Sequence, residues 1–267
     1  PGLTDLADNG FFFRTAPSDA RGGQILAAIT KDRGIGSVAV TYTNNDYGKG
    51  LADVYTTELV GHGITVSTIE SHEDGKADYS SEVATLAAAG GEAVAVIGYI
   101  DQGGKGIIQA SLDSGAFDTF ILSDGMIGDS LTDAFGDSLN KSFGSLPGST
   151  GKGADVFSKV AEAAGIDPSG PYTSESYDAG ALLVLAMQAG GSADRSSIQQ
   201  NVMSVANAPG TKIYPGELKK ALDLLAEGKE IDYEGASSVT FTDVGEAEGS
   251  FLEKEIKGGK FQTKQQR

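Results

Sequence analysis

Two tyrosines and an aspartate, Tyr47, Tyr99 and Asp124, each stand at or just after the end of a predicted strand. In open parallel α/β sheets, ligands bind beyond the carboxyl ends of the strands, so these side chains are expected at one edge of the sheet. Aromatic rings can cover the body of a small organic molecule, and a carboxylate can pair with a positive group on it. Each residue alone could equally be an ordinary turn residue. Their combination predicts a binding site for a small polar molecule.

Residues suited to catalysis are few. The two histidines are His62, in a Gly-His-Gly turn, and His72, in a predicted polar loop, and no serine lies in a G-x-S-x-G elbow. An α/β enzyme that acts on a small anionic substrate is therefore a disfavoured alternative, because no nucleophile and base form a pair. We expect no catalytic residue.

Two glycine-rich segments resemble nucleotide-binding motifs without matching them. In "GYIDQGGKG" (98–106) the spacing from Gly98 to Lys105 is one residue too long, and Gly106 stands where Mg²⁺ binding requires Ser or Thr. "GIGSVA" (34–39) precedes its strand, whereas the dinucleotide fingerprint follows one. Cysteine is absent, which excludes thiolate metal sites. We expect neither a cofactor nor a metal.

The charge balance limits the class of partner. Acidic residues outnumber basic residues 37 to 20 in 267 residues, giving a net charge of −17. Nucleic acids and anionic membrane surfaces are polyanions, so neither is an expected partner.

No apolar run approaches the roughly 18 residues that span a bilayer, so we expect a protein that is not membrane-embedded. The first ten residues carry no signal-peptide pattern, so either the export signal is absent or the chain starts downstream of it.

The elements that must position these residues alternate regularly in the first half. Strands are predicted over 11–15, 37–42, 64–70, 93–99, 118–123 and 141–145. Helices are predicted between them over 18–31, 48–60, 79–89, 105–114 and 130–135. Continuous apolar strands that alternate with helices indicate a parallel sheet covered on both faces.

The second half is helix-rich. Helices are predicted over 154–164, 174–188, 196–206 and 215–226, and strands over 237–241 and within 249–261. We expect this half to have no sheet of its own, although amphipathic helices need an apolar face opposite them. The pattern suggests that part of the molecule lies outside this chain or is supplied by a partner.

Five segments taken together resemble one family. They are "FFFRTAPSD" (11–19), "YGKGLAD" (47–53), "GYIDQGGKGII" (98–108), "LSDG" (122–125) and "YTSESYDAGALL" (172–183). In this order they are similar to the amino-acid-binding receptors of the type I periplasmic binding protein family. The similarity is greatest to the leucine/isoleucine/valine-binding proteins that serve ABC importers, and it extends through essentially the whole chain.

The resemblance implies two α/β lobes joined by three crossover strands, with the ligand enclosed in the cleft between them. The second lobe would comprise 17–141 and 242–262, and the first lobe would retain 1–16 and 146–236. Hinges are expected near 14–17, 143–147 and 237–241. The opening strand–helix units of the first lobe, on the order of 100 residues, would be absent from this chain.

The resemblance also implies roles for the site residues. Tyr47 and Tyr99 match positions whose rings line the pocket from the second lobe, so Tyr47 is expected to be exposed toward the cleft. Asp124 falls where branched-chain binders carry a glutamate that holds the ligand's ammonium group. Tyr177 matches an aromatic residue contributed by the first lobe. The shorter Asp124 leaves the preferred side chain of the ligand open.

The function implied is that of a periplasmic, non-enzymatic receptor that binds an amino acid and delivers it to an ABC permease. An alternative with the same fold is a ligand-sensing domain for an amide, urea or another small molecule.

Overall fold

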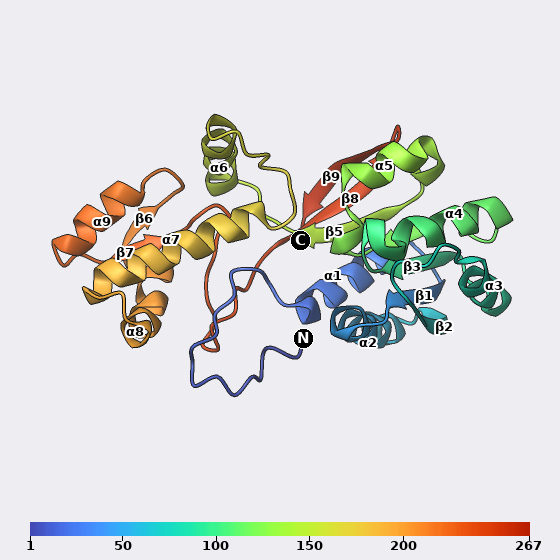
Figure 1. Cartoon of the computed structure of the whole chain (residues 1–267), viewed down its shortest axis with the longest axis horizontal. Helices are drawn as coiled ribbons and strands as arrows, with labels where there is room; N and C mark the ends of the chain where they lie inside the picture. The colour runs from blue at the N-terminus through green and yellow to red at the C-terminus, as the bar shows by residue number, and fades with distance from the viewer. The chain divides into compact units, whose positions relative to one another are not determined.

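The computed structural model describes all 267 residues and divides into two compact units (Figure 1). Unit 1 comprises Asp19–Leu146 and Phe251–Arg267, together with Pro1. Unit 2 comprises Gly2–Ser18 and Pro147–Ser250. None of the helices combines the length and the apolar character that a bilayer-spanning helix requires.

Unit 1 is built on a seven-stranded sheet with the strand order β2-β1-β3-β4-β5-β8-β9. The first five strands pair in parallel, and β8 and β9 form an antiparallel hairpin. Their bounds are β1 Ser37–Thr43, β2 Thr65–His72, β3 Ala93–Ile97, β4 Phe120–Leu122, β5 Phe143–Pro147, β8 Phe251–Lys257 and β9 Lys260–Gln266. The predicted α/β fold with a mainly parallel sheet is confirmed.

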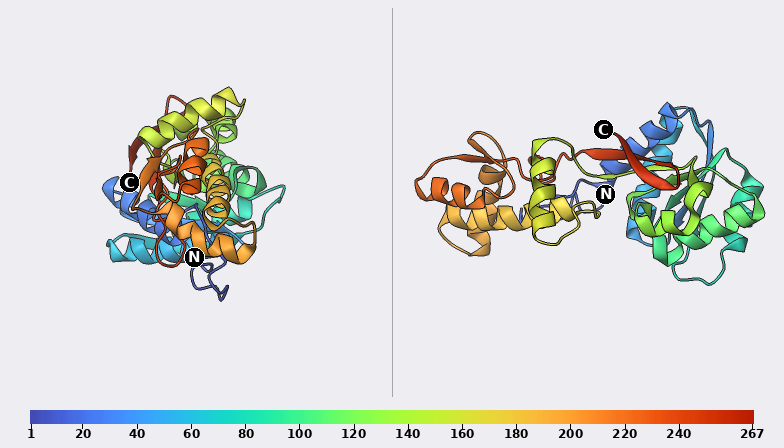
Figure 2. Two further views of the ribbon diagram at one scale, coloured as in Figure 1. Left: turned by 90° about the vertical axis from the view of Figure 1, so that its left-hand side faces the viewer. Right: turned by 90° about the horizontal axis from the view of Figure 1, so that it is seen from above.

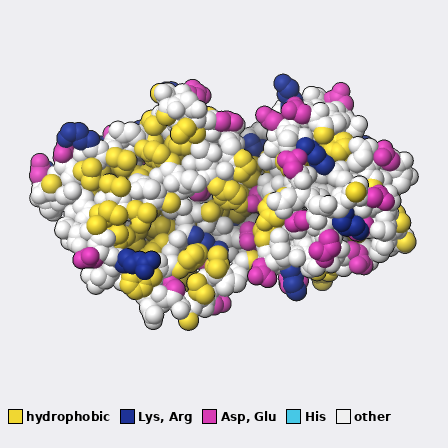
Figure 3. All heavy atoms as spheres, in the orientation of Figure 1, with side chains coloured by type: hydrophobic (Ala, Val, Ile, Leu, Met, Phe, Trp, Pro, Cys, Tyr) yellow, Lys and Arg dark blue, Asp and Glu magenta, His cyan; other side chains and the backbone are white.

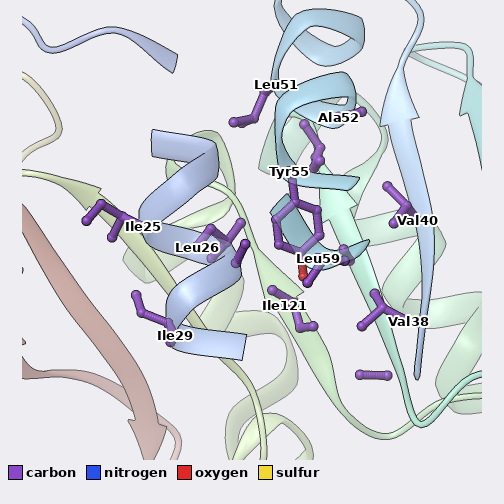
Figure 4. Packing of buried hydrophobic residues seen from close by; sticks show 14 of the residues in the cluster. Ile25, Leu26, Ile29, Val38, Val40, Leu51, Ala52, Tyr55, Leu59 and Ile121 are labelled. Carbon is purple, nitrogen blue, oxygen red and sulfur yellow. The ribbon is translucent and has the colours of Figure 1, made fainter. Parts of the chain in front are cut away.

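Helices cover both faces of this sheet (Figure 2). One face carries α1 (Asp19–Asp32) and α2 (Asp46–Gly61), and the other carries α3 (Ser80–Ala89), α4 (Lys105–Ser114) and α5 (Asp129–Phe135). Successive strand residues point to opposite faces, which explains why the central strands are apolar throughout. Figure 4 shows the first of these two cores, where Tyr55 and Leu59 of α2 lie between α1 and the sheet.

Unit 2 contains four helices and two short strands. The helices are α6 Lys152–Ala163, α7 Thr173–Gly190, α8 Arg195–Ala206 and α9 Leu218–Ala226. Two parallel strands, β6 (Thr211–Ile213) and β7 (Ile231–Tyr233), contribute to the same core as α7, α8 and α9. The expectation that this half has no sheet of its own was wrong, because three-residue strands are too short to give a readable periodicity.

The strands predicted over 11–15 and 237–241 were also wrong. These two segments contribute only isolated β-bridges, Arg14 to Glu246 and Phe241 to Ala247. Their apolar residues pack side chain to side chain instead, with the rings of Phe13 and Phe241 5.7 Å apart. The apolar residues of these two segments therefore predicted strands, although the segments form no continuous hydrogen-bonded ladder with another strand.

The boundaries of the two units lie close to the first two predicted hinges but differ from the third, which was predicted near 237–241. The chain passes between units after Ser18, Leu146 and Ser250, compared with predicted hinges near 14–17, 143–147 and 237–241. Residues 242–250, assigned to the second lobe from the sequence, belong to unit 2. Glu246 holds them there, because its carboxylate forms an ion pair with Arg14 of the same unit.

A buried carboxylate links the β8–β9 hairpin to Arg33, the residue that follows α1. Glu253 is 0% exposed and accepts hydrogen bonds from Arg33 at 2.7 Å, from Arg267 at 2.7 Å and from Gln265 at 2.8 Å. Burial alone would raise the pKa of Glu253, but these hydrogen bonds and the charge of Arg267 lower it to about 2. The ionised form is therefore the one that stabilises unit 1.

We expect Glu253→Gln to destabilise unit 1 by about 2–3 kcal/mol at pH 7, since each unit of pKa shift corresponds to about 1.4 kcal/mol. The folded pKa is depressed, so this contribution is present above the ordinary glutamate pKa of about 4.3 and is lost as the pH falls toward the folded value. Urea denaturation of both proteins at pH 7 and pH 3 measures it, with the exposed Glu227→Gln as the control. A difference in unfolding free energy that is the same at both pH values contradicts the assignment.

Candidate functional site

The three residues predicted to form a site in unit 1 lie together in the structure. They follow β1, β3 and β4, which are neighbours in the sheet. The rings of Tyr47 and Tyr99 are 5.3 Å apart with an interplanar angle of 32°, and the Tyr47 hydroxyl donates to Asp124 Oδ1 at 2.7 Å. All three side chains are half-buried.

Tyr47 is positioned by the start of α2. The side chain of Asn45 caps this helix by accepting a hydrogen bond from Gly48 N at 2.9 Å. A side chain at Gly48 would overlap the carbonyl oxygen of Thr43, so the helix can begin this close to β1 only with glycine here. The ring of Tyr47 also packs against the core, and the expectation of an exposed tyrosine was therefore wrong.

Tyr99 and Asp124 are held by close contact between the ends of β3 and β4. The buried Ser123 accepts a hydrogen bond from Gly98 N at 3.2 Å, and its Oγ lies 3.1 Å from the Tyr47 hydroxyl. A side chain at Gly125 would overlap Gly98 O, so glycine is required there too. Backbone packing therefore orients the side chains of Tyr99 and Asp124.

The electrostatic environment keeps the Tyr99 hydroxyl protonated at neutral pH. Burial raises the pKa of Tyr99, and the negative charges of Asp124 and Asp74 raise it further against a hydrogen bond with the Asn45 side chain. The cluster therefore offers two aromatic faces, phenolic hydroxyl groups and a carboxylate. Such a surface can hold a small molecule that carries a cationic group on a partly apolar body.

Two contributors to this region were missed from the sequence. Asn45 is the N-cap of α2, and an asparagine directly before a helix is a recognisable N-cap signal. His72 was expected in a polar loop, but it is the last residue of β2 and is 1% exposed. No group of three or more His, Cys, Asp or Glu side chains lies close enough together to hold a metal ion.

Tyr177, the fourth predicted site residue, belongs to α7 of unit 2. Its ring lies 5.4 Å from that of Phe157, and its hydroxyl accepts a hydrogen bond from Gly216 N at 3.1 Å. The side chain is half-buried in these contacts. Its proposed role as a ligand contact stays a prediction.

Unit 2 also carries an apolar groove of about 1210 Å³. The N-terminal segment, α7 and α8 line it with residues that include Phe11, Phe13, Leu182, Leu183, Met187 and Val202. Hydrophobic side chains are visible over this part of the molecule in Figure 3. Such a large apolar surface is typical of a face on which another layer of structure packs.

Comparison with known proteins identifies related chains. A relative from Halobacterium salinarum, the chemotactic signal transduction system substrate-binding protein BasB, is 27% identical over 234 residues, which are 85% of this chain and 54% of the relative. The Leu/Ile/Val-binding protein homolog 1 of Brucella melitensis is 30% identical over 70% of this chain and 50% of its own length. This chain thus spans about half the length of these curated relatives.

The fold matches a solved structure over the whole of this chain. The leucine-binding protein LivK of Thermotoga maritima superposes with a TM-score of 0.77 at 19% identity, covering 100% of this chain and 70% of that protein. A family model described as "Periplasmic binding protein" matches residues 1–214. The chain belongs to the type I periplasmic binding protein family.

Proposed function

We propose that this chain is part of a solute-binding receptor of an ABC importer. The receptor binds an amino acid, branched-chain or similar, and delivers it to a permease from the periplasmic side of the membrane. The observation that carries the proposal is the cluster of Tyr47, Tyr99 and Asp124 at the carboxyl edge of the unit 1 sheet. Enclosure of the ligand by a second lobe, to which Tyr177 would contribute, is part of the same proposal.

The chemistry of the cluster favours an amino acid. An ammonium group that leaves water must find a counter-charge, because an unpaired buried ion is costly. Asp124 supplies that charge, and the rings of Tyr47 and Tyr99 supply contact area beside it. The relative from Brucella melitensis is named for binding Leu/Ile/Val, which supports the same ligand class. The relatives described are binding proteins, which supports a role without catalysis.

A sensing role is the second candidate. It is favoured by the relative from Halobacterium salinarum, which matches 85% of this chain and is named as part of a chemotactic system. Both roles begin with the same binding step. A strain that lacks the gene for this protein separates the two roles. Loss of uptake of labelled amino acid indicates a transport receptor, and loss of the tactic response to the amino acid indicates a sensor.

Calorimetric titration of the full-length gene product with L-leucine, L-isoleucine, L-valine, acetamide and urea tests the binding step. We expect at least one amino acid to bind without turnover and to raise the melting temperature by the usual linkage between ligand binding and folding. 4-Methylpentanoate, which is leucine without its amino group, should bind far more weakly. Binding of urea or acetamide alone would replace the amino-acid proposal with the sensing alternative for such compounds.

We expect Tyr47→Ala and Tyr99→Ala each to weaken amino-acid binding by about 2 kcal/mol or more, which is roughly 30-fold. The reason is the loss of a large aromatic contact at the centre of the site. Tyr47→Phe serves as the matched control, because it keeps the ring and removes only the hydroxyl group that bonds Asp124. Unchanged affinity in both alanine variants would return the two tyrosines to the role of turn residues.

A further inference from the structure

One buried histidine, His72, packs against the turn that carries Tyr99. His72 ends β2, and its Nδ1 is 2.9 Å from Oγ1 of Thr41, a fully buried residue of β1. Its Nε2 is buried and has no hydrogen-bond partner. A histidine with one satisfied and one unsatisfied ring nitrogen is unusual, since buried polar atoms are nearly always paired.

The unsatisfied edge of the ring faces the backbone on either side of Tyr99. A methyl group at Gly98 would lie 3.2 Å from His72 Nε2, and one at Gly103 would lie 3.2 Å from Cδ2 and 3.4 Å from Nε2. Gly98 precedes Tyr99, and Gly103 lies within the helical turn Ile100–Gly104 that leads into α4. Tyr99 O accepts hydrogen bonds from Gln102 N and Gly104 N of this turn. The imidazole therefore fills the space under the turn that carries Tyr99.

A second set of contacts ties the same turn to the loop after β2. Gln102 O accepts hydrogen bonds from Gly75 N and from the Tyr79 hydroxyl, and the Tyr79 ring meets the His72 ring edge-on at 6.1 Å. His72 and Tyr79 are both buried. Movement of the imidazole would consequently disturb the turn from two sides.

We propose that His72 is a positioning residue of the ligand site: its uncharged ring supports the Tyr99–Gly104 turn, and protonation of the ring releases this turn and lowers ligand affinity. In the uncharged ring, only one nitrogen carries a hydrogen. Protonation places a hydrogen on both nitrogens and a positive charge beside the backbone of Gly98 and Gly103, where Nε2 has no acceptor. The effect on affinity rests on the proposed function, whereas the release of the turn does not.

The acidic groups around His72 raise its pKa, whereas burial of the ring lowers it. Asp74, Glu82 and Glu73 favour the protonated ring, and Lys76 partly neutralises them through its ion pair with Glu82. The other charged side chains on the packed elements are Glu70, Asp78, Asp101, Lys105 and Asp113. Asp101 and Lys105 form an exposed pair with each other, and Glu70, Asp78 and Asp113 accept hydrogen bonds from Thr68, Ser80 and Gln109 of their own segments. Burial outweighs the acidic groups and lowers the pKa of His72. The supported turn is therefore favoured at neutral pH and loses stability as the pH falls below the ordinary histidine pKa of about 6.5.

Hydrogen exchange measured by mass spectrometry tests the release of the turn. The full-length gene product without ligand is compared from pH 8 to pH 5, with protection corrected for the intrinsic pH dependence of amide exchange. Because one proton is coupled to opening, the opening equilibrium changes by at most about tenfold per pH unit. We expect protection of residues 98–104 to fall on acidification in the wild type. In His72→Asn, which can still bond Thr41 but does not titrate in this range, protection should not vary with pH.

The chain provides a matched control, because it contains only two histidines and no cysteine. His62→Asn, at the half-buried C-cap of α2, should behave like the wild type. Wild-type protection that is independent of pH, or His72→Asn that keeps the pH dependence, overturns the proposal. If His72→Asn does not fold, NMR of ¹⁵N-histidine in the wild type decides: the His72 titration midpoint must coincide with the loss of protection, and a mismatch overturns the proposal.

The affinity for L-leucine at pH 7.5 and pH 5.5 is the second measurement. We expect affinity to fall at pH 5.5 in the wild type and in His62→Asn and to remain unchanged in His72→Asn. L-Leucine itself keeps the same charge between these two pH values. Failure of L-leucine to bind at either pH counts against leucine as the ligand, while the exchange result still decides whether His72 supports the turn.

Discussion

Replacement of Asp124 by asparagine in the full-length gene product should leave folding intact and weaken amino-acid binding by roughly 30-fold to several-thousand-fold. Removing one partner of an enclosed charge pair typically costs about 2–5 kcal/mol, and about 1.4 kcal/mol corresponds to a factor of ten. Asparagine has nearly the same size and can still accept the Tyr47 hydroxyl bond, so the change isolates the charge. Calorimetry with L-leucine or the best ligand of the panel measures the loss.

Asp101→Asn is the matched control for this prediction. Asp101 follows β3 at the same edge of the sheet, but it is exposed and paired with Lys105 at 2.6 Å. An exposed pair of this kind contributes little, so affinity should change by less than about fivefold. Wild-type affinity in Asp124→Asn would show that other groups hold the ammonium. The aspartate would then serve only to organise the turn that follows β4.

Asp178→Ala should destabilise unit 2 by about 3–5 kcal/mol, since it removes the acceptor at the centre of a buried network. Asp178 is 0% exposed and accepts bonds from the Tyr233 hydroxyl and Ala236 N, both at 2.8 Å, and from Ser237 N at 2.8 Å and Ser237 Oγ at 2.6 Å. Alanine leaves all of these donors without a partner in a site that water does not reach.

Chemical denaturation monitored by circular dichroism measures this effect. Each unit needs its own transition or probe, because a protein of two compact units does not generally follow a single two-state transition. Asp223→Ala is the control. Asp223 forms an exposed pair with Lys219 one helical turn away, and its loss should cost less than about 0.5 kcal/mol. A loss below about 1 kcal/mol for Asp178→Ala would mean that the backbone donors find other acceptors.

The proximity of Tyr47, Tyr99 and Asp124 at one edge of the unit 1 sheet could be predicted because its signals are local. Tyr47, Tyr99 and Asp124 each follow an apolar run, and the carboxyl ends of neighbouring parallel strands meet by geometry alone. The helix over 105–114 was likewise predicted with the bounds that α4 has in the structure. These features depend on periodicity and chain order, which a single sequence displays.

The features that were missed depend on partners distant in the chain. His72 looks like a loop residue until Thr41 and Gly98 enclose it, and Phe13 looks like part of a strand until Phe241 packs against it. Likewise, residues 242–250 pack in unit 2 with the help of the ion pair between Arg14 and Glu246, which spans most of the chain. The hydrophobic periodicity of a sequence does not indicate contacts between residues that are far apart in the chain.

The discontinuous composition of unit 1 has a consequence for synthesis on the ribosome. The β8–β9 hairpin belongs to unit 1, but the whole of Pro147–Ser250, about 100 residues, is translated before it. At about 5–20 residues per second, this takes roughly 5 to 20 s. During that interval β5 is an open edge strand and Arg33 lacks Glu253 as a partner. The nascent chain is therefore exposed to mispairing at β5 until the hairpin emerges and closes that edge.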